Sequence, residues 1–100
     1  MRIIWSDESI EDMEMIFKYY LEEANRKVAL KIINEIIDTV YRLKKFPQSG
    51  QKELLFHNRI PDYRYVVSGN HKSIYYIKGQ DINIVSIFDC RQNPTKMELI

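Results

Sequence analysis

The pattern of apolar and polar positions is clearest between Tyr63 and Arg91. Three runs rich in β-branched and aromatic residues are separated by short turns that begin at Gly69 and Gly79; the runs cover residues 63–68, 72–78 and 82–89. This pattern is typical of an antiparallel β-meander. The last run is apolar on both faces at its centre, which predicts a central or well-covered strand.

A helical period precedes the meander. One helix is predicted from an N-cap at Ser6 or Asp7 to about residue 22. A second is predicted over roughly 26–45, from a cap at Asn25 to a stop at Pro47. The stripes expected to be buried are Ile10, Met13, Phe17, Tyr20 and Leu21 on the first helix, and Ala29, Ile32, Ile33, Ile36, Ile37, Val40 and Leu43 on the second. The short connection implies an antiparallel hairpin.

The element order predicts an α+β fold with one domain over residues 1–100. A short strand is expected at 2–5 and an irregular loop at 47–62. Strands segregated from helices place the helical hairpin on one face of an antiparallel meander sheet, in the order β-α-α-β-β-β. Side chains alternate across a strand, so Arg64 shares a face with Val66 and Ser68. We expect that face to be the open one, with Lys72 beside Arg64.

Charge is unevenly distributed along the 100 residues, although the net charge is only +1. Residues 1–23 hold two basic and seven acidic residues, and residues 24–100 hold thirteen basic and seven acidic ones. A basic body can meet a polyanion on one face, whereas a solvated helix face explains the same asymmetry. The second explanation is favoured on this pattern alone.

Several classes are excluded or disfavoured. The single cysteine, Cys90, excludes an internal disulfide and a multi-cysteine zinc site. No apolar run approaches the length of a membrane span, and the N-terminus lacks the apolar core of a signal peptide, so we expect a cytoplasmic protein. No glycine-rich phosphate loop or nucleophilic triad is present, and we expect no metal and no cofactor.

The remaining chemistry is a set of basic and aromatic residues on the predicted sheet: Arg59, Arg64, Lys72 and Arg91 with Tyr63, Tyr65, Tyr75 and Tyr76. Gathered on one face, they would bind RNA and stabilise charge on a transferring phosphate. The alternative is core tyrosines with basic residues on a wet face, and spacing alone favours this alternative.

The chain resembles the RelE/ParE superfamily of toxins from bacterial type II toxin–antitoxin systems, which includes plasmid stabilisation proteins. The resemblance covers essentially the whole chain. It depends on a strand ending in Trp5, Ile16 to Tyr20, Phe46-Pro47-x-x-Gly50, Ile60-Pro61-x-Tyr63-Arg64-Tyr65, Ile74-Tyr75-Tyr76 and Phe88-Asp89-x-Arg91-Gln92-Asn93-Pro94. It implies a helical hairpin on an antiparallel sheet.

Two activities follow from the resemblance. RelE-like members cut mRNA on the ribosome, and ParE-like members poison DNA gyrase. Carried over, the catalytic residues of a RelE-like site are Arg64, Lys72 and Arg91; the binding residues would be Arg59, Tyr63, Tyr65, His71, Tyr75 and Gln92.

Two departures bear on this choice. Val66 occupies a position that is basic in RelE-like members, and no Tyr or His follows Arg91. A phosphate site without an acid or base binds RNA better than it cuts RNA, so the ParE-like, gyrase-binding activity is slightly favoured over the mRNA interferase.

A non-toxic member that serves as a binding partner is a further alternative. The resemblance also implies an antitoxin that wraps the toxin. We expect it on the basic sheet face together with an exposed groove of the helical hairpin.

Overall fold

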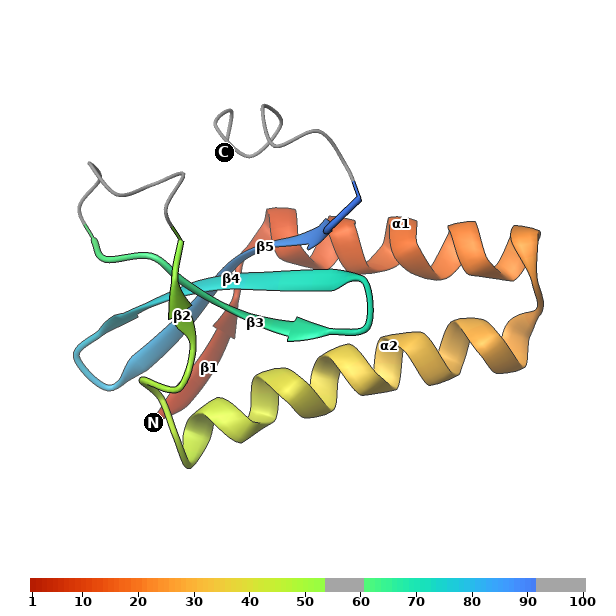
Figure 1. Ribbon diagram of the computed structural model, residues 1–100. Coiled ribbons are helices and arrows are strands. Elements are labelled where there is room, and N and C mark those ends of the chain that lie inside the picture. The colour runs from red at the N-terminus through yellow and green to blue at the C-terminus, as the bar shows by residue number, and fades with distance from the viewer. Residues whose placement is uncertain (54–60, 92–100) are drawn as a thin grey trace.

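The computed structural model describes residues 1–53 and 61–91 of the chain (Figure 1). Its elements, in chain order, are β1 (Arg2–Trp5), α1 (Asp7–Glu23), α2 (Arg26–Tyr41), the 3₁₀ turn η1 (Arg42–Lys44), β2 (Gln51–Lys52), β3 (Arg64–Ser68), β4 (His71–Lys78) and β5 (Asp81–Asp89). The α+β class and the helical hairpin on a sheet are as predicted. No helix of the described part is long and apolar enough to cross a membrane.

The sheet has five strands in the order β1-β5-β4-β3-β2. Strands β3, β4 and β5 form the predicted antiparallel meander, and β5 is well covered, as predicted, between β1 and the central strand β4. The sheet is mixed, however, because β1 pairs with β5 in parallel, with Arg2 opposite Asp81. The two-residue strand β2 lies inside the predicted irregular loop and pairs with β3.

Both helices start at the predicted caps. The Ser6 hydroxyl accepts a hydrogen bond from the Ser9 amide, and the Asn25 side chain accepts one from the Val28 amide. The second helix ends four residues earlier than predicted, at Tyr41, and continues as a 3₁₀ turn. Proline offers no N–H and disfavours helical geometry in the residue before it, so the chain tightens ahead of Pro47.

The main core lies between the helical hairpin and one face of the sheet. Helix α1 packs on β5, and α2 packs on β3 and β4. The buried residues of this core are Ile36, Val40, Leu43, Tyr75, Ile82, Ile84 and Ile87. Two predicted core residues of α1 are instead exposed: Ile10 retains 44% of its surface and Leu21 retains 43%. The apolar stripe is therefore wider than the sheet that covers it.

The predicted sidedness of β3 was wrong. Val66 packs against the main core, whereas Tyr63 and Tyr65 pack on a second cluster formed by Ile74 and Phe88. The side of Arg64 and Val66 therefore faces the helices. Lys72 does not lie beside Arg64, because Lys72 is directly opposite Val67 in the register and so projects from the other face.

A register shift between β4 and β5 is supported from α1. The pairing shifts between Ile74 and Tyr75 of β4. Opposite this irregularity, a carboxylate oxygen of Asp12 accepts hydrogen bonds from the Ile87 amide at 3.0 Å and from the Ser86 hydroxyl at 3.1 Å. Helix α1 therefore satisfies polar groups that an irregular ladder leaves unpaired.

Candidate functional site

Arg64 holds the segment that follows α2. Its Nη1 atom donates to the carbonyl of Gly50 at 3.0 Å and to that of Gln48 at 3.4 Å, and Asp62 lies 3.6 Å from Nη2. A quarter of its side chain is exposed. These contacts anchor the exit from α2 to β3 through one guanidinium group.

Tyr75 fastens the same segment from inside the core. Its side chain is fully buried, and its hydroxyl accepts from the Gly50 amide at 3.0 Å and donates to the Pro47 carbonyl at 2.8 Å. Burial raises the pKa of this phenol. A Cβ at Gly50 would lie 2.7 Å from a Tyr75 ring carbon and 2.8 Å from the Tyr65 carbonyl, so only glycine fits. Tyr75 is thus a core residue rather than a solvent-facing one.

Lys72 belongs to a cluster on the face opposite the helices. Its ammonium lies 2.9 Å from the Glu53 carboxylate and 4.1 Å from the centre of the Tyr65 ring. Glu53 retains only 3% of its side-chain exposure. The Tyr65 hydroxyl donates to Gln51 at 3.0 Å, and the ring of Tyr63 packs edge-on against Tyr76. The lysine charge is therefore balanced by a buried carboxylate.

Arg91 lies at the end of β5 and is paired within its own turn. Its Nε and Nη2 atoms donate to the two oxygens of Asp89 at 3.0 and 2.7 Å. The hydrogen bond from Arg91 lowers the pKa of Asp89 to about 2. His71 is opposite Asp89 in the register, only 4% exposed, and edge-on to the Tyr20 ring. Burial lowers the pKa of His71, opposed by Asp89 and assisted by Arg91.

The three predicted catalytic residues do not converge. Arg64 lies on the helix-covered side, Lys72 on the opposite side and Arg91 at a strand end, and each has a carboxylate partner. Two predicted binding residues, Arg59 and Gln92, lie outside the described residues. Within the described ranges, no three His, Cys, Asp or Glu side chains are grouped to hold a metal ion.

The acidic partners were missed at the sequence level, although the sequence carries a signal for two of them. Asp62 precedes Arg64 by two positions, and Asp89 precedes Arg91 by two positions. Residues two apart share a face in extended chain, so an Asp-x-Arg sequence in or beside a strand indicates a local ion pair. Glu53 had no such signal, because its pairing with Lys72 depends on the packing of distant segments.

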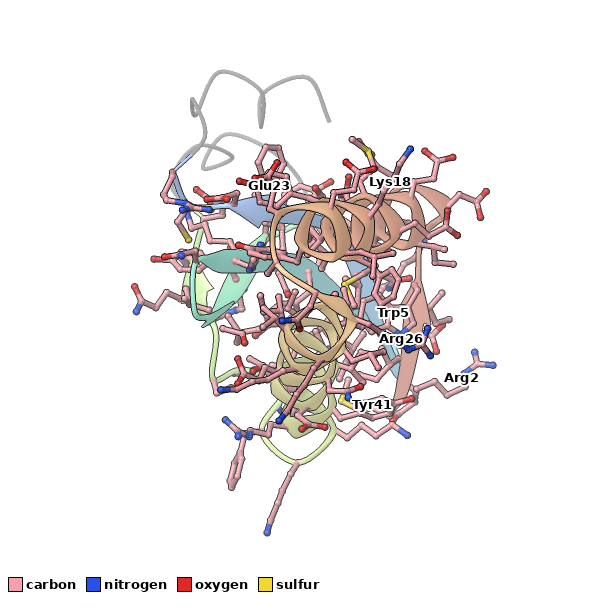
Figure 2. All side chains as sticks on the ribbon, turned by 90° about the vertical axis from the view of Figure 1, so that its right-hand side faces the viewer. Arg2, Trp5, Lys18, Glu23, Arg26 and Tyr41 are labelled. Carbon is pink, nitrogen blue, oxygen red and sulfur yellow. The ribbon has the colours of Figure 1, made fainter. Side chains whose placement is uncertain are left out.

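A second region is an apolar groove of about 430 Å³ on the helical hairpin. Its lining combines β1 and both helices: Trp5, Ile10, Met13, Glu14, Phe17, Ile33, Ile37 and Tyr41. Figure 2 looks onto the tip of the hairpin, with Trp5 and Tyr41 on the side where β1 runs. Tyr41 is 49% exposed and Ile10 is 44% exposed. An exposed apolar groove of this kind suits an amphipathic helix of a partner.

Comparisons with known proteins agree with this architecture. The family model described as "ParE toxin of type II toxin-antitoxin system, parDE" matches residues 3–94. A solved structure titled "Chromosomal ParDE TA system from P. aeruginosa" superimposes with a TM-score of 0.74 at 21% identity, covering 89% of this chain and 95% of that chain. At this identity the likeness establishes the shared fold. No curated protein matches the chain.

Proposed function

The chain belongs to the ParE toxin family of type II toxin–antitoxin systems, and on that premise we propose that it arrests growth by binding DNA gyrase. The observation that carries the proposal is the separation and neutralisation of Arg64, Lys72 and Arg91. A ribonuclease site needs cations gathered around one phosphate and a group that exchanges protons. A toxin that acts by binding needs neither.

One observation favours the alternative, a ribosome-dependent mRNA endoribonuclease. His71 lies opposite Asp89, whose carboxylate holds Arg91, so an imidazole and a guanidinium meet at one end of the sheet. The imidazole is almost fully buried, and its lowered pKa leaves it neutral at physiological pH. An acid–base role would therefore require the strand end to open.

The discriminating experiment is induced expression with two readouts taken together. The gyrase proposal predicts trapped gyrase–DNA complexes and DNA-damage signalling, with mRNA intact at early times. Rapid mRNA cleavage and a stop in translation would overturn it in favour of the ribonuclease. Normal growth of cells shown to contain folded protein would favour the third alternative, a non-toxic member. A cytoplasmic location is expected in all three cases.

The ParDE family assignment implies an antitoxin partner. We place its amphipathic segment in the groove between α1 and α2 rather than on the sheet cations. Apolar side chains line this groove, and Glu14 adds a carboxylate. Helix α1 holds seven acidic residues against one lysine, so a basic polar face would complement it.

A matched pair of variants on α1 tests this placement. Ile10 and Met15 are both exposed, but only Ile10 is among the groove-lining residues. Ile10→Asp should weaken antitoxin binding about tenfold or more, since a charge placed in an apolar contact must be desolvated. Met15→Asp should leave the affinity unchanged. Equal losses in the two variants, measured by calorimetry with matched melting temperatures, would contradict the placement.

A further inference from the structure

The corner where α2 passes into β2 carries charge that no carboxylate of the described residues balances. Residues 39–52 contain four cations and no carboxylate. Arg42, Lys44, Lys45 and Lys52 are all exposed, and in the described part of the chain none of them forms an ion pair. This contrasts with Arg64, Lys72 and Arg91, each of which has a carboxylate partner.

Two aromatic rings are interleaved with these cations. Phe46 is 59% exposed and Tyr41 is 49% exposed. The Lys45 ammonium lies 5.8 Å from the centre of the Phe46 ring, and the Lys44 ammonium lies 5.3 Å from that of Tyr41. A hollow of about 450 Å³ opens beside Phe46, lined by residues 45–49. Cations and an open ring face are thus presented together.

A stabilising role in the fold explains only some of these four cations. Cations near the C-terminus of α2 interact favourably with the helix dipole, which explains Arg42 and Lys44. The dipole does not explain Lys52, which is directly opposite Arg64 in the register between β2 and β3. Like charges directly opposite each other in an antiparallel pair are destabilising. Asp62 balances Arg64 in this pair, whereas Lys52 has no carboxylate partner among the described residues.

We propose that this corner, defined by Arg42, Lys44, Lys45, Phe46 and Lys52, binds single-stranded DNA, with the cations on phosphates and a base stacked on Phe46. Basic residues that follow a backbone beside an exposed aromatic ring are the usual means of binding single strands. A duplex keeps its bases stacked inside and would leave Phe46 unused. An acidic peptide would satisfy the cations but supplies no flat ring system for Phe46.

The choice of DNA over RNA rests on the proposed gyrase target, since cations and a stacking ring bind either kind of single strand. The binding assay contains no gyrase, so the two proposals fail separately. Loss of gyrase trapping with intact DNA binding would affect only the proposed function. Absence of DNA binding with intact gyrase trapping would affect only this inference.

Fluorescence anisotropy with a short labelled single-stranded DNA tests the inference. The logarithm of the binding constant should fall with the logarithm of salt concentration with a slope of about −2, for about three contacted phosphates. Lys44→Glu/Lys45→Glu should weaken binding at least tenfold and flatten the slope by about 1.4. Phe46→Ala should weaken binding by about tenfold without changing the slope, because it removes stacking and no charge.

A basic pair at the far end of α2 provides the control. Lys27 and Lys31 are exposed on the same helix, so Lys27→Glu/Lys31→Glu makes the same change of charge away from the corner. It should retain most of the affinity. Equal losses in both double variants, no binding by the unmodified protein at low salt, or tighter binding to a duplex or to RNA of the same sequence would each overturn the inference. Lys44→Glu/Lys45→Glu also loses a favourable interaction with the dipole of α2, so its melting temperature should fall slightly, and binding is measured well below it.

Discussion

The meander and the helical hairpin present opposite kinds of surface. On the meander, the cations that suggest a phosphate site are each held by a carboxylate of the same chain, at 2.7 to 3.6 Å. On the hairpin, apolar residues that a helical period assigns to a core line an exposed groove. The meander, whose residues suggest a binding site, has its charges paired within the chain. The hairpin, whose residues suggest a core, leaves apolar surface uncovered. Unsatisfied surface is the better guide to where a partner binds.

Breaking the Lys72–Glu53 pair should have the largest effect on stability. Lys72→Met removes a charged hydrogen bond to a carboxylate that is almost fully buried, and we expect a loss of about 2–3 kcal/mol in the free energy of unfolding. Urea unfolding of Lys72→Met, of Glu53→Gln and of the double variant measures the coupling between the two side chains. A coupling near zero would mean that Lys72 is free to bind another ligand. The meander would then not be internally satisfied, contrary to the contrast drawn above.

The close contact between Tyr75 and Gly50 should give the next largest effect on stability. Gly50→Ala places a methyl group against the Tyr75 ring and the Tyr65 carbonyl, where the backbone cannot yield cheaply. We expect a loss of about 1–3 kcal/mol. Gly69→Ala is a poor control because Gly69 has a positive φ, so Ser49→Ala, at an exposed neighbouring position, is the better one. Thermal melting of the two variants should separate them clearly.

The groove should behave in the opposite way from these two sites. Tyr41→Ala should change stability little, because about half of the surface of this residue is already exposed. It should weaken antitoxin binding by about tenfold, since aromatic anchors contribute most to such interfaces. Calorimetric titration and melting curves measured on the same samples give the two numbers. A large loss of stability with unchanged affinity would show that Tyr41 serves the core of the protein and not antitoxin binding.

His71 should produce a smaller effect that depends on pH. Burial lowers the pKa of His71 below its ordinary value of 6.5, so the unfolded chain binds more protons than the folded one just below that pH. The contribution of neutral His71 to the free energy of unfolding is therefore fully present above pH 6.5. It falls as the pH drops from 6.5 to the pKa of His71 in the folded protein. His71→Phe should flatten the melting temperature over this interval. Asp89 titrates at about 2 and does not contribute there.

Arg91 should matter least for stability. Its side chain is 60% exposed, and exposed ion pairs contribute little. Arg91→Ala should leave the melting temperature unchanged. In the toxicity assay it should have no effect if the protein only binds gyrase, whereas relief of toxicity would restore the phosphate-binding role and weaken the contrast between the two regions.

Local chemistry predicted most of the fold. The three meander strands were predicted to within one residue at each end, and both turn glycines adopt positive φ, 57° at Gly69 and 61° at Gly79. What failed depended on non-local pairing. Alternation divides β3 into two sets but does not say which set meets the helices, and Val66 and Val67 suit either side. The parallel partner of β1 and the strand β2 also depend on segments distant in sequence.

The candidate site was harder to predict for a related reason. A helical period marks Ile10, Ile33 and Ile37 as apolar face, yet it cannot state how far a sheet extends beneath them. The cations of the meander could be identified in the sequence, but Glu53, the partner of Lys72, could not be predicted from it. Only the Asp-x-Arg spacing carries local information about the partners of these cations. It indicates that Arg64 and Arg91 are each paired with a nearby aspartate rather than free for catalysis.

The parallel pairing of β1 with β5 has a consequence for the order of events during synthesis. Arg2 leaves the ribosome early, but its strand partner Asp81 is made 79 residues later. The support that β5 gives to Trp5 at the edge of the groove therefore cannot form until β5 has been made. Closing so long a loop also slows folding. Every surface that depends on the position of β1, the edge of the groove at Trp5 included, is therefore completed only after β5 has been made.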